Sequence, residues 1–362
     1  MNPLLLHEFH AELDASFIEV NGVEIVENYG DALGEHAALR DTGGVLDLSF
    51  RSRFCLTGAD RGKFLHGQVT NDVNRLNLGE GCYAALVNAK GKMQSDLNIY
   101  VLENEILLDF EPGYGVAVAQ RLEKYVIADD VQVVDASPHY GLLSVQGPKA
   151  SEAVGGLDFG AELPAKPMNF VSRKDNTLGE LYLMNSPRIG TNGFDLFVPT
   201  ASLGTVTDKL VAAIKSTGGR ACGWQALETA RIEAGIPRFG VDMDETNLPP
   251  EAGIEDRAVS YSKGCYIGQE VIARIRTYGQ VAKSLRGLRL ADSIKVLPQK
   301  DDKLYRGDKE IGYVTSAVAS PTLKSNIALA YVRREANQIG TELTLRTAEG
   351  DNAATVVPLP FR

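Results

Sequence analysis

Short apolar runs broken by turn residues constrain the fold of this chain more than any other feature. Between residues 44 and 140 the runs are closed by glycine, asparagine or proline, as strands that enter tight turns are. Helical patterns over residues 59–71 and 114–124 lie among them. This mixture predicts an α+β region with antiparallel sheets. The predicted strands are FRSRFCLTG, GCYAALVNAKGK, SDLNIYVLEN, EILLDFEPG and DDVQVVDAS.

The rest of the chain divides into two further regions. Residues 140–240 contain three strand-like runs (LLSVQG, ELYLMN, GFDLFVP) and two helical patterns, over residues 202–215 and 223–234. Gly235 and Pro237 are expected to end the second helix. After Arg286 only short strands and turns remain, which predicts a small all-β module, a barrel or a sandwich.

The length of 362 residues exceeds the usual size of a single hydrophobic core, so we expect two or three domains. We predict two α+β subdomains within residues 1–285, with an approximate split near residue 140. The all-β module then occupies residues 286–362.

Charge and cysteine usage exclude several classes of protein. The formal net charge of −10 disfavours non-specific binding to nucleic acid or to anionic lipid. No segment has the length needed to span a bilayer, and the N-terminus lacks the basic start of a secretory signal. The four cysteines are scattered without a C-x-x-C pair, so we expect no metal site, free thiols and a cytoplasmic location.

The string SKGCYIGQE places Cys265 between two glycines. Gly264 and Gly268 allow backbone turns that side chains would block. Residues 269–276 read as a helix, and the start of a helix, together with Lys263, would favour the thiolate of the cysteine. A buried and inert cysteine is the alternative, because free cysteine is among the most buried residue types.

Ten short motifs carry a resemblance over nearly the whole chain, from about residue 40 onwards. In order and spacing they resemble the folate-binding superfamily of the glycine-cleavage aminomethyltransferase, the T protein, and most closely its YgfZ-type branch. The most specific mark of that branch is K-G-C-Y-x-G-Q-E, here Lys263, Gly264, Cys265, Tyr266, Gly268, Gln269 and Glu270. The other nine motifs are FLHGQVTNDV (64–73), GCY (81–83), NAKGKMQSDL (88–97), VQGP (145–148), GFD (193–195), GWQALETARIEAG (223–235), PPE (249–251), GYVTS (312–316) and PLPF (358–361).

The resemblance implies a three-domain, cloverleaf-like ring around a central folate-binding channel. The two α+β subdomains are interwoven in this family, and a C-terminal β-barrel forms the third domain. The implied cofactor is tetrahydrofolate or a one-carbon derivative of it. One ring enclosing one folate would suffice as a monomer.

The same resemblance implies the folate contacts. Asp195 stands where the T protein has its pterin-binding glutamate, and a carboxylate can accept the paired N–H donors of a pterin edge. Tyr83 stands at a folate-contacting tyrosine, and Arg231 at an arginine that reaches the folate. Without the resemblance these residues read as a turn acid, a half-buried strand tyrosine and one half of a surface ion pair with Glu228.

Two positions bear on catalysis. The T protein has two adjacent acids where this chain has Ser95 and Asp96, and one of those acids orients the folate nitrogens for attack on the aminomethyl carbon. If Asp96 is that acid, one-carbon transfer remains possible; otherwise it is a solvent-facing acid at a strand start. T proteins typically carry an aspartate in place of Cys265, so the cysteine distinguishes the branch.

Three functions follow as hypotheses. The first is a tetrahydrofolate-binding protein whose Cys265 thiol supports assembly or repair of iron–sulfur clusters in client enzymes, and tRNA modification only indirectly, without direct binding of nucleic acid. The second is an aminomethyltransferase that moves a methylene group from a lipoyl-bound aminomethyl adduct to tetrahydrofolate. The third is a folate-binding scaffold without chemistry.

Overall fold

The computed structural model describes residues 3–157 and 162–361. The chain divides into two compact units that are each assembled from separate segments. Unit 1 consists of Met1–Ala84 and Ser95–Glu228, and unit 2 of Ala85–Gln94 and Thr229–Arg362. Unit 2 therefore takes in the segment 229–285 as well as the predicted all-β module. The domain boundaries near residues 140 and 286 remain predictions from the sequence.

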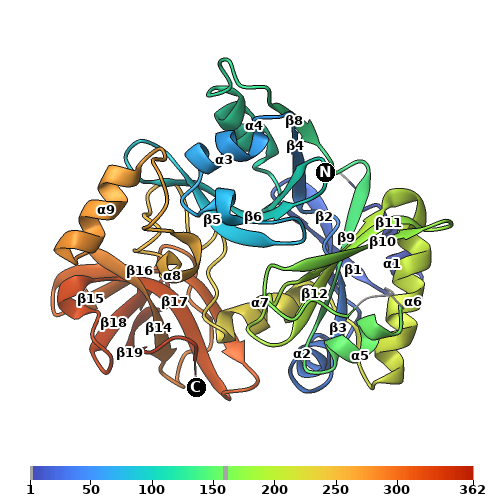
Figure 1. Cartoon of the computed structure of the whole chain (residues 1–362). Helices are drawn as coiled ribbons and strands as arrows, with labels where there is room; N and C mark the ends of the chain where they lie inside the picture. Colours follow the sequence, from blue (N-terminus) through green and yellow to red (C-terminus); the bar gives the residue numbers. More distant parts are fainter. Residues whose placement is uncertain (1–2, 158–161, 362) are drawn as a thin grey trace. The chain divides into compact units, whose positions relative to one another are not determined.

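A six-stranded sheet forms the centre of unit 1 (Figure 1). Its strands are antiparallel except for the last, which pairs in parallel with its neighbour. In spatial order they are β10 (Phe170–Asp175), β11 (Gly179–Asn185), β12 (Gly193–Pro199), β9 (Tyr140–Gln146), β3 (Gly44–Asp47) and β13 (Arg220–Ala221).

Helices α5 (Ala150–Gly155) and α6 (Leu203–Ser216) pack on one face of this sheet. The helix α6 buries Leu203, Val206, Leu210 and Ile214, at the three- and four-residue spacing that gives a helix one apolar side. They meet Phe194, Leu196 and Val198, alternate residues of β12. Because successive strand residues point to opposite faces, Asp195 and Phe197 project from the other face of the sheet.

A second sheet has five strands, in the order β5 (Gly81–Val87), β6 (Met93–Val101), β7 (Ile106–Phe110), β4 (Ser52–Thr57) and β8 (Gln132–Asp135). The connection between β5 and β6, with the adjoining strand ends, is the segment 85–94 of unit 2. The other elements that begin in unit 1 are α1 (His7–Ala11), the hairpin of β1 (Ser16–Val20) and β2 (Val23–Asn28), α2 (Ala32–Asp41), α3 (Arg61–Gln68), the 3-10 turn η1 (Val73–Arg75), α4 (Gly115–Glu123), the 3-10 turn η2 (Thr200–Ser202) and α7 (Trp224–Glu233), whose last turns belong to unit 2.

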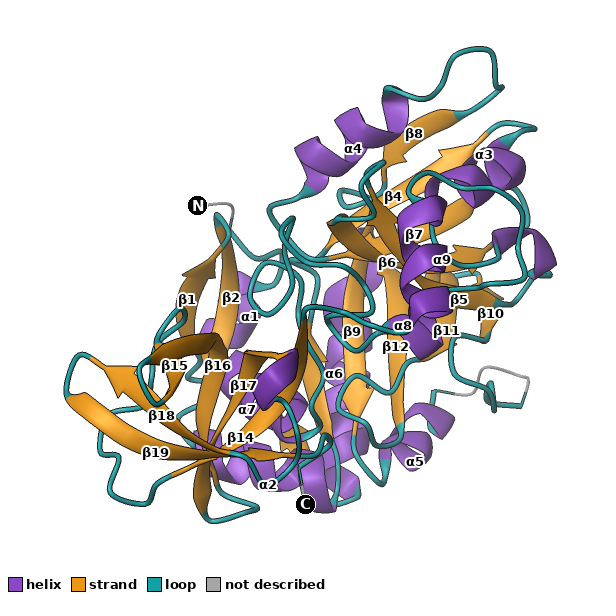
Figure 2. Cartoon of the chain, turned by 90° about the vertical axis from the view of Figure 1, so that its left-hand side faces the viewer, coloured by secondary structure: helices purple, strands orange, loops and turns teal. Residues whose placement is uncertain are grey.

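A closed six-stranded barrel forms most of unit 2 (Figure 2). Around the barrel the strands are β14 (Lys283–Leu290), β17 (Ser325–Arg333), β16 (Lys309–Ser320), β15 (Lys303–Arg306), β18 (Glu342–Thr347) and β19 (Gly350–Val357). The 3-10 turn η3 (Arg334–Ala336) follows β17. Alternate residues of β17 are buried in two different clusters, so the strand reads as a continuous apolar run: Ala328, Ala330 and Val332 join one, and Ile327, Leu329 and Tyr331 the other.

The SKGCYIGQE segment of unit 2 follows helix α8 (Glu255–Ala258), and its last two residues begin helix α9 (Gln269–Tyr278). Gly268 caps the start of α9 in the left-handed region, with φ of 84°. A Cβ at this position would lie 2.5 Å from the carbonyl oxygen of Asn88, in the β5–β6 connection. The second glycine of the motif is therefore needed both for its backbone conformation and for close packing.

The predicted α+β class and the C-terminal barrel are confirmed. The strands predicted between residues 44 and 140 and in the barrel are present, and residues 269–276 do form a helix, which extends to Tyr278. The helix predicted over residues 59–71 is shorter and ends at Gln68. Strand β10 and the β1–β2 hairpin, in which charged residues interrupt short apolar runs, were not predicted. Among the described residues, no helix is both long and apolar enough to cross a membrane.

The two glycines that flank α9 allow a matched test of packing. Gly268 and Gly279 both have positive φ, but a Cβ at Gly279 would meet nothing within 4 Å. We expect Gly279→Ala to lower the free energy of unfolding by roughly 1–2 kcal/mol, the cost of a left-handed conformation in a non-glycine residue. Gly268→Ala should cost about 2 kcal/mol more, because backbone atoms must move. Urea unfolding of both variants measures the difference, and equal losses would contradict the packing argument.

Candidate functional site

Two predicted site residues of unit 1 are in direct contact. Tyr83 lies on β5 and Asp96 on the neighbouring strand β6, and the Tyr83 hydroxyl donates a hydrogen bond of 2.8 Å to Oδ2 of Asp96. Both side chains are only partly buried. The contact holds the carboxylate in one orientation on the sheet surface.

The residue before Asp96 faces the opposite side of β6. Along this strand Ser95, Leu97 and Ile99 are buried, whereas the alternate positions 94, 96 and 98 are half-buried. The Ser95 hydroxyl donates to the backbone carbonyl of Asp96 at 3.0 Å. Of the two positions that carry acids in the T protein, the one that keeps its acid here is therefore the one whose side chain reaches Tyr83.

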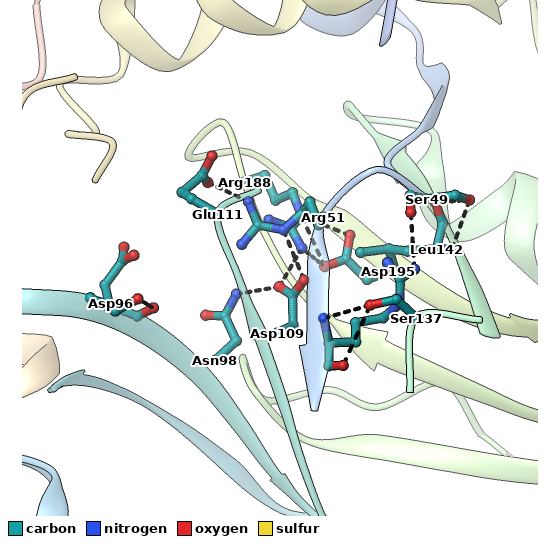
Figure 3. Close-up of polar contacts among 12 residues, drawn as sticks. Ser49, Arg51, Asp96, Asn98, Asp109, Glu111, Ser137, Leu142, Arg188 and Asp195 are labelled. Atoms are coloured by element: carbon teal, nitrogen blue, oxygen red, sulfur yellow. Dashed lines mark hydrogen bonds and ion pairs between the residues drawn. The ribbon is translucent and has the colours of Figure 1, made fainter. Parts of the chain in front are cut away.

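Asp195 takes part in a buried ion network (Figure 3). The Nε of Arg188 donates to both carboxylate oxygens of Asp195, at 3.0 Å to Oδ1 and 2.9 Å to Oδ2, and Nη2 lies 2.7 Å from Oδ2. The side chain of Asp195 is 1% exposed and that of Arg188 is 14% exposed. The alternative of a turn acid is wrong, because Asp195 lies in the middle of β12.

The network continues onto the five-stranded sheet. Asp109, on β7, accepts hydrogen bonds from Nη2 of Arg188 at 3.1 Å and from Nε of Arg51 at 2.8 Å. A second nitrogen of Arg51 binds Glu111. Asn98, two residues after Asp96 on the same face of β6, donates to Asp109 at 2.9 Å. Hydrogen bonds thus link Asn98 to Asp195 through Asp109 and Arg188, and Asp96 lies apart from this network (Figure 3).

Charge compensation sets the ionisation of this network. Burial opposes the charged form of Asp109, but Arg51 and Arg188 outweigh it and lower the pKa of Asp109 to about 2. Burial opposes the charge of Arg188 as well, and Asp195 with Asp109 raises its pKa above the ordinary value. Asp109 and Arg188 are therefore both charged at neutral pH.

Arg231, on α7, belongs to a separate buried network in unit 2. Its guanidinium binds Asp242 and lies 3.0 Å from the Ser316 hydroxyl, and the other oxygen of Asp242 accepts from Thr315 at 2.5 Å and from Ser316 at 2.6 Å. Arg231 is 3% exposed, so the alternative that places it at the surface is wrong. A contact from Arg231 to folate remains a prediction.

Cys265 is exposed in the loop before α9, so the alternative of a buried cysteine is wrong. It is the exposed member of the four free cysteines; Cys55 and Cys222 are buried and Cys82 is partly buried. Lys263 is itself buried, with Nζ 4.8 Å from the centre of the Tyr266 ring. The loop is thus held by its lysine and tyrosine, and the thiol projects from it.

The described residues contain no group of three or more histidine, cysteine, aspartate or glutamate side chains placed to hold a metal ion. The sequence analysis missed Arg51, Asp109 and Glu111. One signal was present: Asp109 interrupts the apolar strand ILLDF, and an acid inside a buried strand requires a partner. The identity of the partner depends on the pairing of strands, which the pattern does not give.

Comparison with known proteins identifies the class that this fold defines. Residues 6–263 match the GCVT N-terminal domain, and residues 283–362 match the glycine cleavage T-protein C-terminal barrel domain. The chain therefore belongs to the glycine cleavage T-protein family. Members of this family use tetrahydrofolate as a substrate or cofactor.

The chain is similar over nearly its full length to proteins named aminomethyltransferase. It is 28% identical to the one from Bacillus pumilus over 356 residues, which cover 98% of this chain and 97% of the relative. The relative from Halalkalibacterium halodurans is 29% identical over 357 residues, or 98% and 96% of the two chains.

A solved structure supports the same fold. The crystal structure of glycine cleavage system aminomethyltransferase T from Bartonella henselae superimposes with a TM-score of 0.89 at 23% identity, covering 100% of this chain and 98% of that one.

The network generates a prediction about acid stability. The pKa of Asp109 is lower in the folded protein than its ordinary 3.8, so its contribution to stability is full above pH 4 and is lost as the pH falls toward 2. We expect this contribution to be roughly 2 kcal/mol between those limits. In urea unfolding, Asp109→Asn should have a lower free energy of unfolding than wild type at pH 5. The difference between the two proteins should decrease by roughly 2 kcal/mol as the pH falls toward 2.

Asp351 provides the control, because it pairs with Arg346 at the surface. Asp351→Asn should follow the wild-type curve closely, since exposed pairs contribute little. A gap between wild type and Asp109→Asn that is independent of pH would contradict the assignment.

Proposed function

We propose that this protein binds tetrahydrofolate and transfers a one-carbon unit to it, as an aminomethyltransferase. The observation that carries the proposal is the pair of Tyr83 and Asp96. Asp96 lies on the half-buried face of β6, and the neutral hydroxyl of Tyr83 orients its carboxylate. The relatives named aminomethyltransferase support the same conclusion.

The acceptor groups of unit 1 fit a reduced pterin. Asp195 accepts adjacent N–H donors on both carboxylate oxygens, here from Arg188, and a pterin edge presents adjacent N–H donors of the same kind. In the proposed site Asp195 holds this edge and Tyr83 contacts the ring. A contact of Arg231 with the folate stays a prediction from the resemblance. Tetrahydrofolate supplies the nucleophilic nitrogen.

The role of Asp96 is to orient and polarise. A carboxylate fixed by the Tyr83 hydroxyl can accept a hydrogen bond from the attacking amine and stabilise the positive charge that develops on it during attack. Ser95 takes no part, because its side chain lies on the other face of the strand.

The turnover assay uses an aminomethylated lipoyl carrier protein and tetrahydrofolate, with release of ammonia as the readout. We expect the wild type to exceed the buffer control, and Asp96→Asn to lose about 100-fold in kcat while still binding folate. Tyr83→Phe should lose about tenfold, because the carboxylate keeps its charge but not its orientation.

Ser95→Ala is the matched control and should change the rate less than about twofold, because its hydroxyl bonds only to the adjacent backbone. A wild-type rate equal to that in buffer would remove the proposal. Unchanged turnover in Asp96→Asn would remove the role of the acid.

The exposed thiol favours a second candidate function, support of iron–sulfur cluster assembly or repair as in the YgfZ-type branch. It rests on Cys265, which is exposed and belongs to the complete K-G-C-Y-x-G-Q-E string. Under this function the chain would act in the cytoplasm on client enzymes, as a folate-binding monomer, and would affect tRNA modification only through them. Lys263, Gly264, Tyr266, Gly268, Gln269 and Glu270 would position the thiol.

This second function is tested in cells that lack the native protein. We expect Cys265→Ala to fold and bind folate, yet to restore less than about a tenth of the iron–sulfur enzyme activity that the wild type restores. Cys82→Ser, a change at a partly buried cysteine, is the control and should restore it fully. Full rescue by Cys265→Ala would leave the thiol without a role and favour a scaffold or a transferase.

A further inference from the structure

The guanidinium of Arg188 contacts both carboxylate oxygens of Asp195, the atoms that would accept hydrogen bonds from a ligand. Its Nε and Nη2 engage both carboxylate oxygens at 2.7 to 3.0 Å. The carboxylate is 1% exposed, so its remaining lone pairs have little access to solvent. No second pair of donors can approach the same oxygens while Arg188 is in place.

We propose that Arg188 is a gate of the pterin site, an internal competitor that must leave Asp195 before a pterin edge can bind there. The inference rests on the proposed function, in which Asp195 holds that edge. Arg188 and a pterin offer the same kind of donor group, adjacent N–H bonds in one plane, to the same two oxygens. When a pterin binds, Asp195 thus loses its hydrogen bonds from Arg188 and gains equivalent ones from the pterin edge.

The position of Arg188 suits a movable group. It lies in the loop between β11 and β12, and its side chain is 14% exposed, against 1% for both of its carboxylate partners. Its backbone N–H donates to Oε1 of Gln146 at 3.0 Å, which fixes the main chain, so a change of side-chain rotamer alone would move the guanidinium.

Arg188 also has a second anchor. Nη2 lies 3.1 Å from Oδ2 of Asp109, so the guanidinium can leave Asp195 and keep an ion pair. Asp109 is shared with Arg51, whose other partner is Glu111. The positive charge therefore stays within the network when the gate opens, which avoids the cost of an isolated buried cation.

The gate has a thermodynamic consequence. A ligand that binds only the open state has an apparent dissociation constant equal to its intrinsic constant divided by the fraction of molecules in that state. The smaller this fraction is, the weaker the observed binding. A full folate can offset this cost through contacts elsewhere on the molecule, whereas a bare pterin has little besides the edge itself. The gate therefore weakens the binding of both ligands by the same factor, and a ligand with contacts beyond the pterin ring keeps the higher affinity.

The test measures binding of 5-formyltetrahydrofolate and of pterin by isothermal titration calorimetry to the full chain. Arg188→Met removes all donors with little change in length. We expect it to bind 5-formyltetrahydrofolate about tenfold more tightly than wild type, and pterin more tightly by about the same factor. Arg188→Lys keeps the positive charge but has a single ammonium group. Its affinity for 5-formyltetrahydrofolate should lie between those of wild type and Arg188→Met.

Arg346→Gln is the matched control. In the barrel, Nε and Nη2 of Arg346 bind both oxygens of Asp351, but at the surface. Its loss should leave folate affinity unchanged. Circular dichroism and thermal unfolding establish that each variant is folded, and Arg188→Lys serves as the test if Arg188→Met is not.

Two outcomes overturn the gate. Folate binding by Arg188→Met, or by Arg188→Lys if that is the folded variant, that is equal to or weaker than wild type would show that Arg188 does not compete. Equal tightening in the Arg188→Met, Asp195→Asn double variant would show that the gain does not pass through Asp195. Failure of the proposed function is distinct, because the wild type and every variant would then fail to bind folate at all.

Discussion

A buried set of ion pairs joins the two sheets of unit 1, and the geometry of the candidate site depends on it. Arg188 bridges Asp195 on the six-stranded sheet and Asp109 on the five-stranded sheet. Removing several charges from water is costly, and such a set persists only when each charge meets an opposite one in good geometry. The network is therefore a constraint on relative position: the two sheets must keep the separation at which one guanidinium reaches both carboxylates.

The same network explains why a carboxyl side chain can be buried at position 195. An isolated carboxylate in a strand interior would take up a proton or unfold the strand. Here the strand supplies apolar neighbours on one face and a guanidinium on the other. A ligand that replaces the guanidinium must offer equivalent donors, which restricts the chemistry of anything that binds at this point.

Much of the fold could be predicted from the sequence, because strand period and turn residues are local signals. The barrel strands and the helix after Gly268 are examples. The site could be predicted only in part. The choice of Asp195 and Asp96 as candidate site residues came from the resemblance, whereas their contacts with Arg188 and Tyr83 depend on strand register, which single-sequence patterns do not encode. Arg231 shows the same limit, since its partner Asp242 lies beyond the end of its helix.

The division of the chain into units has a consequence for its synthesis. The segment 85–94 belongs to unit 2, and its backbone is bound there by residues near Asn247, which accepts from the N–H of Met93 at 3.0 Å. On the ribosome, the strands β5 and β6 emerge long before that partner exists. The segment 85–94 can therefore reach its folded contacts in unit 2 only after the residues around Asn247 have been synthesised.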